Sequence, residues 1–347
     1  MKEYIWNLSD LNKISKNGYK VFSCFSCGGG SSMGYKLSGY EVIGNCEIDD
    51  KINEMYLKNF KPKYNYNMAI QNMIKQDEFP EDLYNLDILD GSPPCSTFSI
   101  AGAREKNWGK AKKFREGQAK QVLDDLFFEF IKLAEILKPK IIVAENVKGL
   151  IGGNAKGYVN LINKRFNEIG YNVQFFLLNA ATMGVPQRRE RVFFICTRKD
   201  LNLPKIKLSF NEKPILYGDF ADTNYKQFNK TILYYKRWLK RKDCDNSIGD
   251  TVKRTENGKI SGFNCVYFKR DKIPPTIPAG AQMIRFDKPG YLSNKDIITI
   301  STFPQDYNFN GMSVQYVCGM SVPPVMMKKI SEQIKIQLLD KLEGNYG

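Results

Sequence analysis

Short apolar runs alternate with amphipathic stretches from Tyr19 to about Arg198, and this alternation limits the fold more than any other feature of the chain. Apolar runs of this length indicate buried strands, and the amphipathic stretches between them indicate helices. Strands that alternate with helices favour an α/β fold with a doubly wound, mostly parallel sheet. The expected strands are residues 19–24, 41–46, 86–89, 141–144, 172–178 and 192–197, and the expected helices are residues 32–37, 50–60, 124–137 and 160–169.

The character of the chain changes after Arg198. Residues 225–272 are strongly basic, and aromatic side chains are set among their lysines and arginines. A proline-rich link follows at 273–278, and residues 322–339 have the pattern of an amphipathic helix with prolines in its first turn. We therefore expect a main domain at 18–224, a smaller domain at 225–272, and a return to the main domain at 273–347.

The charge of the chain limits its partners. Lysine and arginine number 52 and aspartate and glutamate 37, a formal net charge of +15, which favours a polyanionic partner without separating DNA from RNA or an acidic membrane surface. No apolar run approaches the ~18 residues of a membrane span, and the N-terminal residues lack the apolar core of a signal peptide. We expect a cytoplasmic protein that makes no membrane contact.

Histidine is absent, and its absence limits the chemistry. An acid, base or nucleophile in this chain must be a carboxylate, cysteine, lysine, tyrosine or serine. The eight cysteines are scattered, so a disulfide framework is not expected in a reducing cytosol. Cys24 and Cys27 have CxxC spacing, but no second such pair accompanies them, and we expect no metal site.

A glycine-rich turn follows the first predicted strand. Gly28, Gly29 and Gly30 lead into the next helix, where glycine lets the backbone approach a ligand and the helix start presents free N–H groups. Glu47 comes at the end of the second predicted strand, where a carboxylate can accept hydrogen bonds from both ribose hydroxyls of a nucleoside cofactor. A tight structural turn is the alternative.

Two further strand ends carry groups capable of catalysis. Cys95 follows two prolines after the third predicted strand, so its thiol is expected on a stiffened loop at the carboxyl edge of the sheet. A small buried hydrophobic residue is the alternative for this cysteine. Glu145 follows four apolar strand residues, and so poorly solvated a carboxyl group is a candidate proton donor. The alternative for Glu145 is a buried glutamate paired with an arginine.

Two arginines precede the last predicted strand. Arg189 and Arg191 are two residues apart, so both side chains can point to one face. A solvated charge cluster is the alternative, but their place between Pro186 and the apolar run 192–195 argues against it.

These four motifs, in this order, resemble the DNA (cytosine-C5) methyltransferase family. The family's Phe-x-Gly-x-Gly-Gly loop is similar to residues 25–30, and its Pro-Cys nucleophile is similar to Pro94-Cys95. Its Glu-Asn-Val motif matches residues 145–147, and its Gln-x-Arg-x-Arg motif matches residues 187–191. The resemblance extends to residues 126–128, 302–307 and 319–324, and it covers nearly all of the chain except about 225–272.

The resemblance implies a Rossmann-like enzyme that transfers a methyl group from S-adenosyl-L-methionine to cytosine C5 in a specific duplex DNA sequence, leaving S-adenosyl-L-homocysteine. Cys95 is expected to add to C6 of a flipped-out cytosine, and Glu145 to donate a proton to N3. Arg191 is expected to stabilise O2, and Arg189 or Arg191 to favour the thiolate. The expected cofactor pocket consists of Phe25, Ser26, Cys27, Gly28, Gly29, Gly30, Glu47, Ile48, Ile70, Pro94, Leu126, Ser321 and Val322.

The same resemblance assigns the remaining segments and the partners. Residues 225–272 correspond to the family's variable target-recognition domain, whose phosphate contacts would make affinity fall with salt. The basic, glycine-spaced segment 101–115, which contains Trp108, is expected to close over the flipped base, with a solvated basic loop as the alternative. The expected partners are double-stranded DNA and a cognate restriction endonuclease. An orphan or phage enzyme would lack the endonuclease, and we expect a monomer.

Three departures from the family pattern concern the cofactor pocket. Cys27 stands where the family usually has the first glycine of the loop. No carboxylate stands near Ala69-Ile70, where the family's acidic residue would contact the adenine amine. Met320 replaces the family's late asparagine. The departures put cofactor affinity in question more than the type of reaction.

Two other functions are compatible with parts of the pattern. A tRNA cytosine-C5 methyltransferase would share the Pro-Cys and Glu-Asn-Val chemistry, but the basic insert favours DNA. A catalytically inert regulator that binds nucleic acid would have no chemical reason to keep Cys95, Glu145, Arg189 and Arg191 together.

Overall fold

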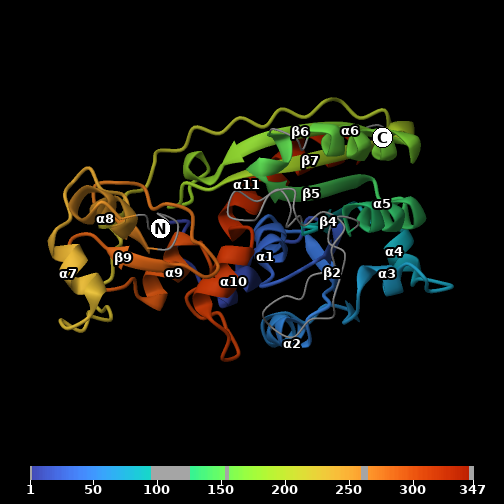
Figure 1. Ribbon diagram of the computed structural model, residues 1–347. Helices are drawn as coiled ribbons and strands as arrows, with labels where there is room; N and C mark the ends of the chain where they lie inside the picture. Colours follow the sequence, from blue (N-terminus) through green and yellow to red (C-terminus); the bar gives the residue numbers. More distant parts are fainter. Residues whose placement is uncertain (1, 95–125, 153–155, 259–264, 344–347) are drawn as a thin grey trace. The chain divides into compact units, whose positions relative to one another are not determined.

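Two compact units make up the computed structural model, which describes residues 2–94, 126–152, 156–258 and 265–343 (Figure 1). The larger one, here called the sheet unit, consists of Ser9–Asn179, Glu190–Phe210 and Met326–Gly347. The other, here called the smaller unit, consists of Met1–Leu8, Ala180–Arg189 and Asn211–Val325. The basic insert expected at 225–272 lies within the smaller unit.

Seven strands of the described residues form the sheet, in the order β3-β2-β1-β4-β5-β7-β6. They are β1 Lys20–Cys24, β2 Glu41–Cys46, β3 Tyr64–Tyr66, β4 Ile88–Gly91, β5 Ile141–Val147, β6 Tyr171–Asn179 and β7 Glu190–Arg198. Neighbouring strands are parallel, except that β7 runs antiparallel to both β5 and β6. The expected doubly wound, mostly parallel sheet is confirmed, and all six predicted strands are present.

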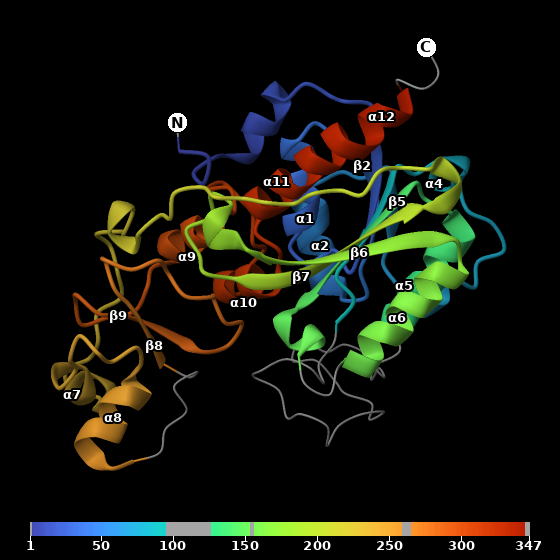
Figure 2. The ribbon, with the colours of Figure 1, turned by 90° about the horizontal axis from the view of Figure 1, so that it is seen from above.

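Helices cover both faces of this sheet. They are α1 Gly30–Leu37, α2 Asp50–Asn59, α3 Ile70–Met73, α4 Glu81–Tyr84, α5 Leu126–Leu137, α6 Lys156–Glu168, α11 Pro324–Ile334 and α12 Asp340–Glu343. Helices α5 and α6 lie on one face, and α1, α2 and α11 lie on the other (Figure 2). The predicted C-terminal helix is α11, which begins at its proline and continues through a π-helical turn at Lys335–Leu339 into α12.

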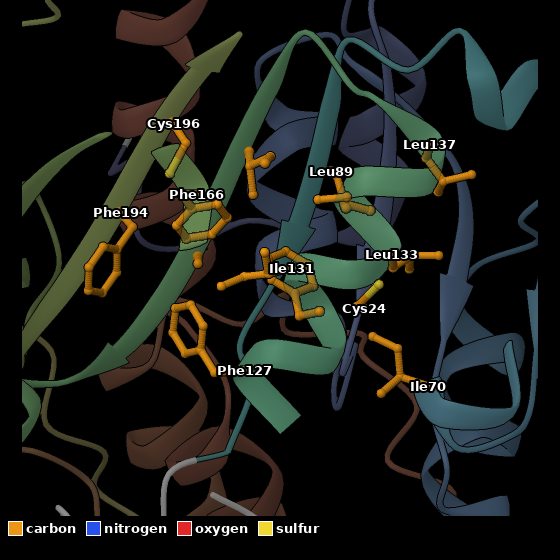
Figure 3. Close-up of a cluster of buried hydrophobic side chains, with 14 of the residues drawn as sticks. Cys24, Ile70, Leu89, Phe127, Ile131, Leu133, Leu137, Phe166, Phe194 and Cys196 are labelled. Carbon is orange, nitrogen blue, oxygen red and sulfur yellow. The ribbon is translucent and has the colours of Figure 1, made fainter. Parts of the chain in front are cut away.

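An apolar layer joins the sheet to α5 and α6 (Figure 3). Phe194 of β7 meets Phe127 of α5 with ring centroids 5.6 Å apart, and Phe127 meets Phe166 of α6 at 6.2 Å. Leu89 of β4 and Ile131 of α5 belong to the same cluster. The seven apolar positions from which the sequence predicts a helix are all buried in α5: Leu126, Phe127, Phe130, Ile131, Leu133, Ala134 and Leu137.

The smaller unit has an apolar core of its own. Its strands β8 Cys265–Phe268 and β9 Gln282–Arg285 pair in parallel, and its helices include α7 Leu233–Leu239, α8 Ile248–Glu256, α9 Asn294–Ile300 and α10 Val314–Met320. The core consists of Phe228, Trp238, Ile248, Val252, Cys265, Tyr267 and Ile284. No helix within the described ranges, in either unit, has the length and apolar character to cross a membrane.

Arginines of the basic insert hold this core together. The guanidinium carbon of Arg241 lies 3.3 Å from the ring centroid of Trp238, a cation–π contact. Arg254 forms an ion pair with the buried Asp245. Several lysines of the insert are exposed instead: Lys236, Lys240, Lys242 and Lys253. Arg241 and Arg254 thus stabilise the unit, whereas these four lysines face solvent.

The first residues of the chain also belong to the smaller unit. Trp6 is buried, and its Nε1 donates a hydrogen bond to the carbonyl of Thr302 at 2.8 Å, across a separation of 296 residues. The backbone N–H of Leu8 donates to the carboxylate of Asp306 at 2.7 Å. The N-terminal segment is therefore an integral part of this unit.

Substitution of Gly91 should destabilise the sheet unit. A Cβ at this position would lie 2.5 Å from the ring of the fully buried Phe130, which has no room to move. We expect Gly91→Ala to lower the free energy of unfolding by about 1–3 kcal/mol, measured by urea denaturation. Gly157→Ala in α6 is the matched control, because its Cβ would meet nothing within 4 Å. Equal effects of the two substitutions would contradict the assigned packing.

Candidate active site

Three of the four motifs found in the sequence lie where strands end at one edge of the sheet. Strand β4 is parallel to both β1 and β5, and the chain order reverses between β1 and β4. The register places Cys24 beside Gly91, and Gly91 beside Ala144, so the carboxyl ends of the three strands are level. Ligands of α/β sheets bind at such a reversal point. The glycine loop, the Pro-Pro turn and Glu145 therefore start from the same edge.

The loop between β1 and α1 turns through left-handed backbone conformations. Phe25, Cys27 and Gly29 have φ of 54°, 45° and 71°. A Cβ on Gly29 would lie 2.5 Å from the ring of Phe60, so this position requires glycine for space as well as for φ. Cys27 adopts the conformation that the family's usual glycine would take freely, at a cost of roughly 1–2 kcal/mol. The departure at Cys27 therefore keeps the shape of the loop.

Glu47 holds this loop in place from the end of β2. It is buried, and its Oε2 accepts a hydrogen bond from the backbone N–H of Cys27 at 2.9 Å. Its Oε1 accepts one from the N–H of Asp49 at 3.0 Å. Burial raises the pKa of Glu47, while these backbone donors oppose the rise. A carboxylate has about four acceptor sites, so Glu47 can brace the loop and still accept from ribose hydroxyls.

The surroundings of the loop fit an adenosyl cofactor. Helix α1 begins after Gly29 without a side-chain cap, so its first N–H groups are not covered by a side chain. The Oδ2 of Asp49 is buried without a hydrogen-bond partner among the described residues, as a site for a polar ligand would require. Ile70 and Leu126 are buried in the apolar layer, and Ile48 is half-buried. The residues around the loop thus offer hydrogen-bond acceptors, hydrogen-bond donors and apolar contacts to a cofactor.

Gln71 is a polar group that sequence analysis missed. It follows Ala69-Ile70, where the family's adenine-binding carboxylate is absent, and it lies on α3. Its Oε1 is buried and has no hydrogen-bond partner in the part of the chain that the structure describes. The sequence signal was weak, because a glutamine outside a motif has many ordinary roles.

Asn146 ties the Pro-Pro turn to the neighbouring strand. Its Nδ2 donates a buried hydrogen bond to the carbonyl of Pro93 at 3.1 Å, and its Oδ1 accepts from the N–H of Val147 at 2.8 Å. Pro94 is half-buried. Cys95 and the segment 101–115 lie outside the described residues. The turn that leads to Cys95 is therefore attached to the residue next to Glu145.

Glu145 forms an ion pair with Arg191 across the antiparallel strands β5 and β7. The distance from Glu145 Oε1 to Arg191 Nε is 3.0 Å, and the side chains are only 12% and 16% exposed. Burial lowers the pKa of Arg191, and the charge of Glu145 offsets this. Arg191 also donates to the carbonyl of Glu190 at 2.8 Å. Glu145 is therefore paired with an arginine, an arrangement that fits both the expected proton donor and the alternative of a structural ion pair.

The other predicted residues belong to the smaller unit. Arg189 is buried, and its Nη1 donates to the carbonyl of Gly319 at 3.0 Å, so the two arginines of the motif have different partners. Ser321 and Val322 follow α10 and are buried, whereas Met320 is 43% exposed. Across both units, no group of three or more Cys, Asp or Glu in the described segments could hold a metal ion.

Asp90 is a second polar residue that sequence analysis did not assign. It is buried on β4, and its carboxylate accepts hydrogen bonds from the hydroxyls of Ser23 at 2.9 Å and Tyr35 at 3.3 Å. Burial raises the pKa of Asp90 to about 7, although these hydroxyls oppose the rise. An acid inside the apolar run that forms β4 was the available signal. The hydrogen bonds of Asp90 link β4, the strand before the Pro-Pro turn, to β1 and α1.

The buried Asp90 should make the stability of the protein depend on pH. In the unfolded chain its pKa is near 3.8, and in the folded protein it is about 7, so between these values only the unfolded state has lost the proton. The free energy of unfolding therefore falls as the pH rises from about 4 to about 7. We expect wild type to lose on the order of 2 kcal/mol more than Asp90→Asn between pH 5 and pH 8 in urea unfolding. Parallel pH profiles for the two proteins would refute this assignment.

Comparisons with known proteins place the chain in a family. A model of the C-5 cytosine-specific DNA methylase family matches residues 19–336. The type II methyltransferase M.FnuDI of Fusobacterium nucleatum is 30% identical over 93% of this chain and 96% of its own length. The type II methyltransferase M1.HphI of Haemophilus parahaemolyticus is 26% identical over 89% of this chain and 85% of its own length.

Solved structures show the same fold. A mutant of Spodoptera frugiperda DNMT2 has a TM-score of 0.61 at 18% identity, covering 92% of this chain and 100% of its own. The Entamoeba histolytica methyltransferase EhMeth has a TM-score of 0.58 at 17% identity, covering 94% and 99%. The family match and the type II relatives do not favour a tRNA methyltransferase or an inert regulator. The chain belongs to the C-5 cytosine-specific DNA methylase family and is a DNA cytosine-C5 methyltransferase.

Proposed function

We propose that this methyltransferase acts through a covalent bond between Cys95 and C6 of a cytosine flipped out of a specific duplex sequence. The observation that carries the proposal is the Glu145–Arg191 ion pair beside the Asn146–Pro93 hydrogen bond. Because β4 and β5 are parallel neighbours, the acid Glu145 lies on the strand next to the turn that leads to Cys95, and its cation Arg191 reaches it from β7. Family membership implies S-adenosylmethionine as the methyl donor and DNA as the substrate.

The chemistry explains why a thiol, an acid and a cation are needed together. Cytosine C5 is too electron-poor to take a methyl group unaided, and addition of the Cys95 thiolate to C6 moves electron density onto C5, N3 and O2. S-adenosylmethionine supplies an electrophilic methyl group when bound. After C5 is methylated, its proton leaves to a base, the C6–S bond breaks, and the electron pair of that bond returns to Cys95.

Glu145 and Arg191 are suited to the charge that develops on the ring. Glu145 is proposed to hold a proton at N3, and a free N–H of Arg191 is proposed to donate to O2. A guanidinium has five N–H donors, and the contacts of Arg191 with Glu145 and with the Glu190 carbonyl leave others for substrate. Because the chain has no histidine, Arg191 is also proposed to favour the thiolate. Arg189, bonded to Gly319, is proposed as a positioning residue.

A covalent trap tests the nucleophile. With duplex DNA containing 5-fluorocytosine and S-adenosylmethionine, wild type should form a denaturation-resistant adduct. C5 then has fluorine in place of the hydrogen that a base would remove, so the enzyme cannot be released. Cys95→Ser should form none while it binds the duplex with nearly unchanged affinity. Glu145→Gln should slow adduct formation by roughly 100-fold or more, since it removes the proposed proton donor.

The outcomes of the trap are distinct. An adduct with Cys95→Ser would overturn the covalent mechanism. Loss of duplex binding by Cys95→Ser would require a second variant, Cys95→Ala, that binds and still forms no adduct. Circular dichroism of each variant checks that a missing adduct does not reflect unfolding.

The cofactor is proposed to lie against the glycine loop, with Glu47 at the ribose. Phe25, Ile48, Ile70, Pro94 and Leu126 would provide apolar contacts. We propose that the unpaired Oε1 of Gln71 accepts a hydrogen bond from the adenine amine, in place of the family's carboxylate. This assignment would explain how the pocket tolerates the absence of an acid near Ala69.

Titration calorimetry with S-adenosylmethionine tests Gln71. Gln71→Met keeps the length of the side chain but removes the acceptor, so affinity should fall up to about tenfold. Asn72→Ala, at an exposed position on the same helix, is the control and should bind normally. An analogue whose adenine lacks the amine should bind wild type and Gln71→Met alike. A difference that persists with this analogue would argue against the proposed contact.

The biological setting follows from the relatives. Because the matched relatives include type II methyltransferases, we propose a cognate restriction endonuclease as a partner. As a separate proposal, the active form is a monomer. Bisulfite sequencing of DNA from cells that express the chain would test the reaction and identify the recognition sequence. Unmodified cytosines throughout that DNA, with folded protein present, would contradict the proposed specificity for duplex DNA.

A further inference from the structure

The smaller unit contains a pocket of about 580 Å³ that the catalytic mechanism does not use. Its lining includes three buried apolar side chains, Met283, Leu292 and Ile297. It also includes three exposed polar side chains, Lys226, Gln282 and Asn294. All of these residues belong to the smaller unit, so the pocket is complete within one compact part of the protein.

Backbone hydrogen bonds hold the pocket in shape. The N–H of Tyr291 donates to the carbonyl of Lys226 at 3.0 Å, and the N–H of Leu292 donates to the carbonyl of Met283 at 3.1 Å. The side-chain amide of Gln315 donates to the carbonyls of Pro278 and Ala281, directly before Gln282. The segments that carry the polar side chains are thus fixed before any ligand arrives, which lowers the entropy cost of binding.

The polar groups of the pocket are available to a ligand. The side chains of Gln282 and Asn294 have no hydrogen-bond partner among the residues that the structure describes, unlike Gln315. The lining contains one lysine and, within the described segments, no acidic side chain. A carboxamide presents a donor and an acceptor side by side, the pattern that matches N6 and N7 of adenine. An amine beside it suits a phosphate.

We propose that this pocket reads one A·T base pair of the DNA recognition sequence. The carboxamides of Gln282 and Asn294 contact the edge of the adenine, and Lys226 binds a neighbouring backbone phosphate. The inference rests on the proposed function, because it requires a specific duplex sequence as substrate. A chain of net charge +15 acting on DNA meets phosphates wherever its lysines are exposed, whereas two carboxamides that line one pocket together with buried apolar side chains offer the donors and acceptors that base recognition needs.

The test measures methylation of a duplex library in which every position around the target cytosine is varied. Gln282→Ala or Asn294→Ala should lower discrimination at one A·T pair by about tenfold or more, with the other positions unchanged. Gln227→Ala is the matched control, because Gln227 is exposed beside Lys226 but does not line the pocket. The control should keep the specificity of wild type at every position.

Lys226→Gln should have a different effect from the amide variants. It should weaken binding to all duplexes alike and reduce the slope of log affinity against log salt by about one. Lys295→Gln, at an exposed position outside the pocket lining, serves as its control. The melting temperature of each variant confirms that the smaller unit is folded.

Two results would overturn the proposal. The first is wild-type discrimination at every position in both amide variants, and the second is relaxation at a G·C pair instead of an A·T pair. A wild-type enzyme that methylates no duplex in the library would instead contradict the proposed function. The failures of the two proposals are therefore distinguishable.

Discussion

The parallel pairing of β1, β4 and β5 is the constraint on which the catalytic site depends. Parallel strands end at the same edge, and the register of these three strands keeps their last residues level. The chain leaves that edge three times, into the glycine loop, the Pro-Pro turn and the Glu145-Asn146 end of β5. Groups separated by more than a hundred residues in sequence are thereby gathered without any contact specific to the chemistry. The buried hydrogen bond from Asn146 to Pro93 then connects the end of β5 to the Pro-Pro turn.

Much of this arrangement could be predicted from sequence, because the strands are buried and carry an apolar signal. The helix α5 shows the same effect, since each of its predicted apolar positions is buried. Strand β3 was not expected, because its sequence, Tyr-Asn-Tyr, is polar and none of its residues is fully buried. The type and position of the buried strands and of α5 follow from their periodicity. The short edge strand β3 depends instead on hydrogen bonds with its neighbour β2.

The residues proposed for the candidate site were chosen from sequence motifs, whereas the contacts between them came only from the structure. Glu145 was expected as an acid, but only the antiparallel pairing of β5 with β7 brings Arg191 to it. Glu47 was expected at a ribose, and its hydrogen bond to Cys27 follows from a loop conformation that no pattern encodes. Asp90 and Gln71 lie outside any motif, and their interest comes from burial alone. The local sequence indicates which residues have catalytic side chains, whereas the pairing of the strands determines which charged side chains contact each other.

The position of the N-terminal segment has a consequence for the synthesis of the chain. Trp6 finds its hydrogen-bond partner Thr302 only after 296 further residues have been added. At ribosomal rates of about 5–20 residues per second, this indole waits roughly 15 to 60 s for the carbonyl that binds it. The sheet unit also remains incomplete until α11 emerges. Both units therefore close only after residues beyond 300 have been made, and until then the indole N–H of Trp6 must be hydrogen-bonded to another partner such as water.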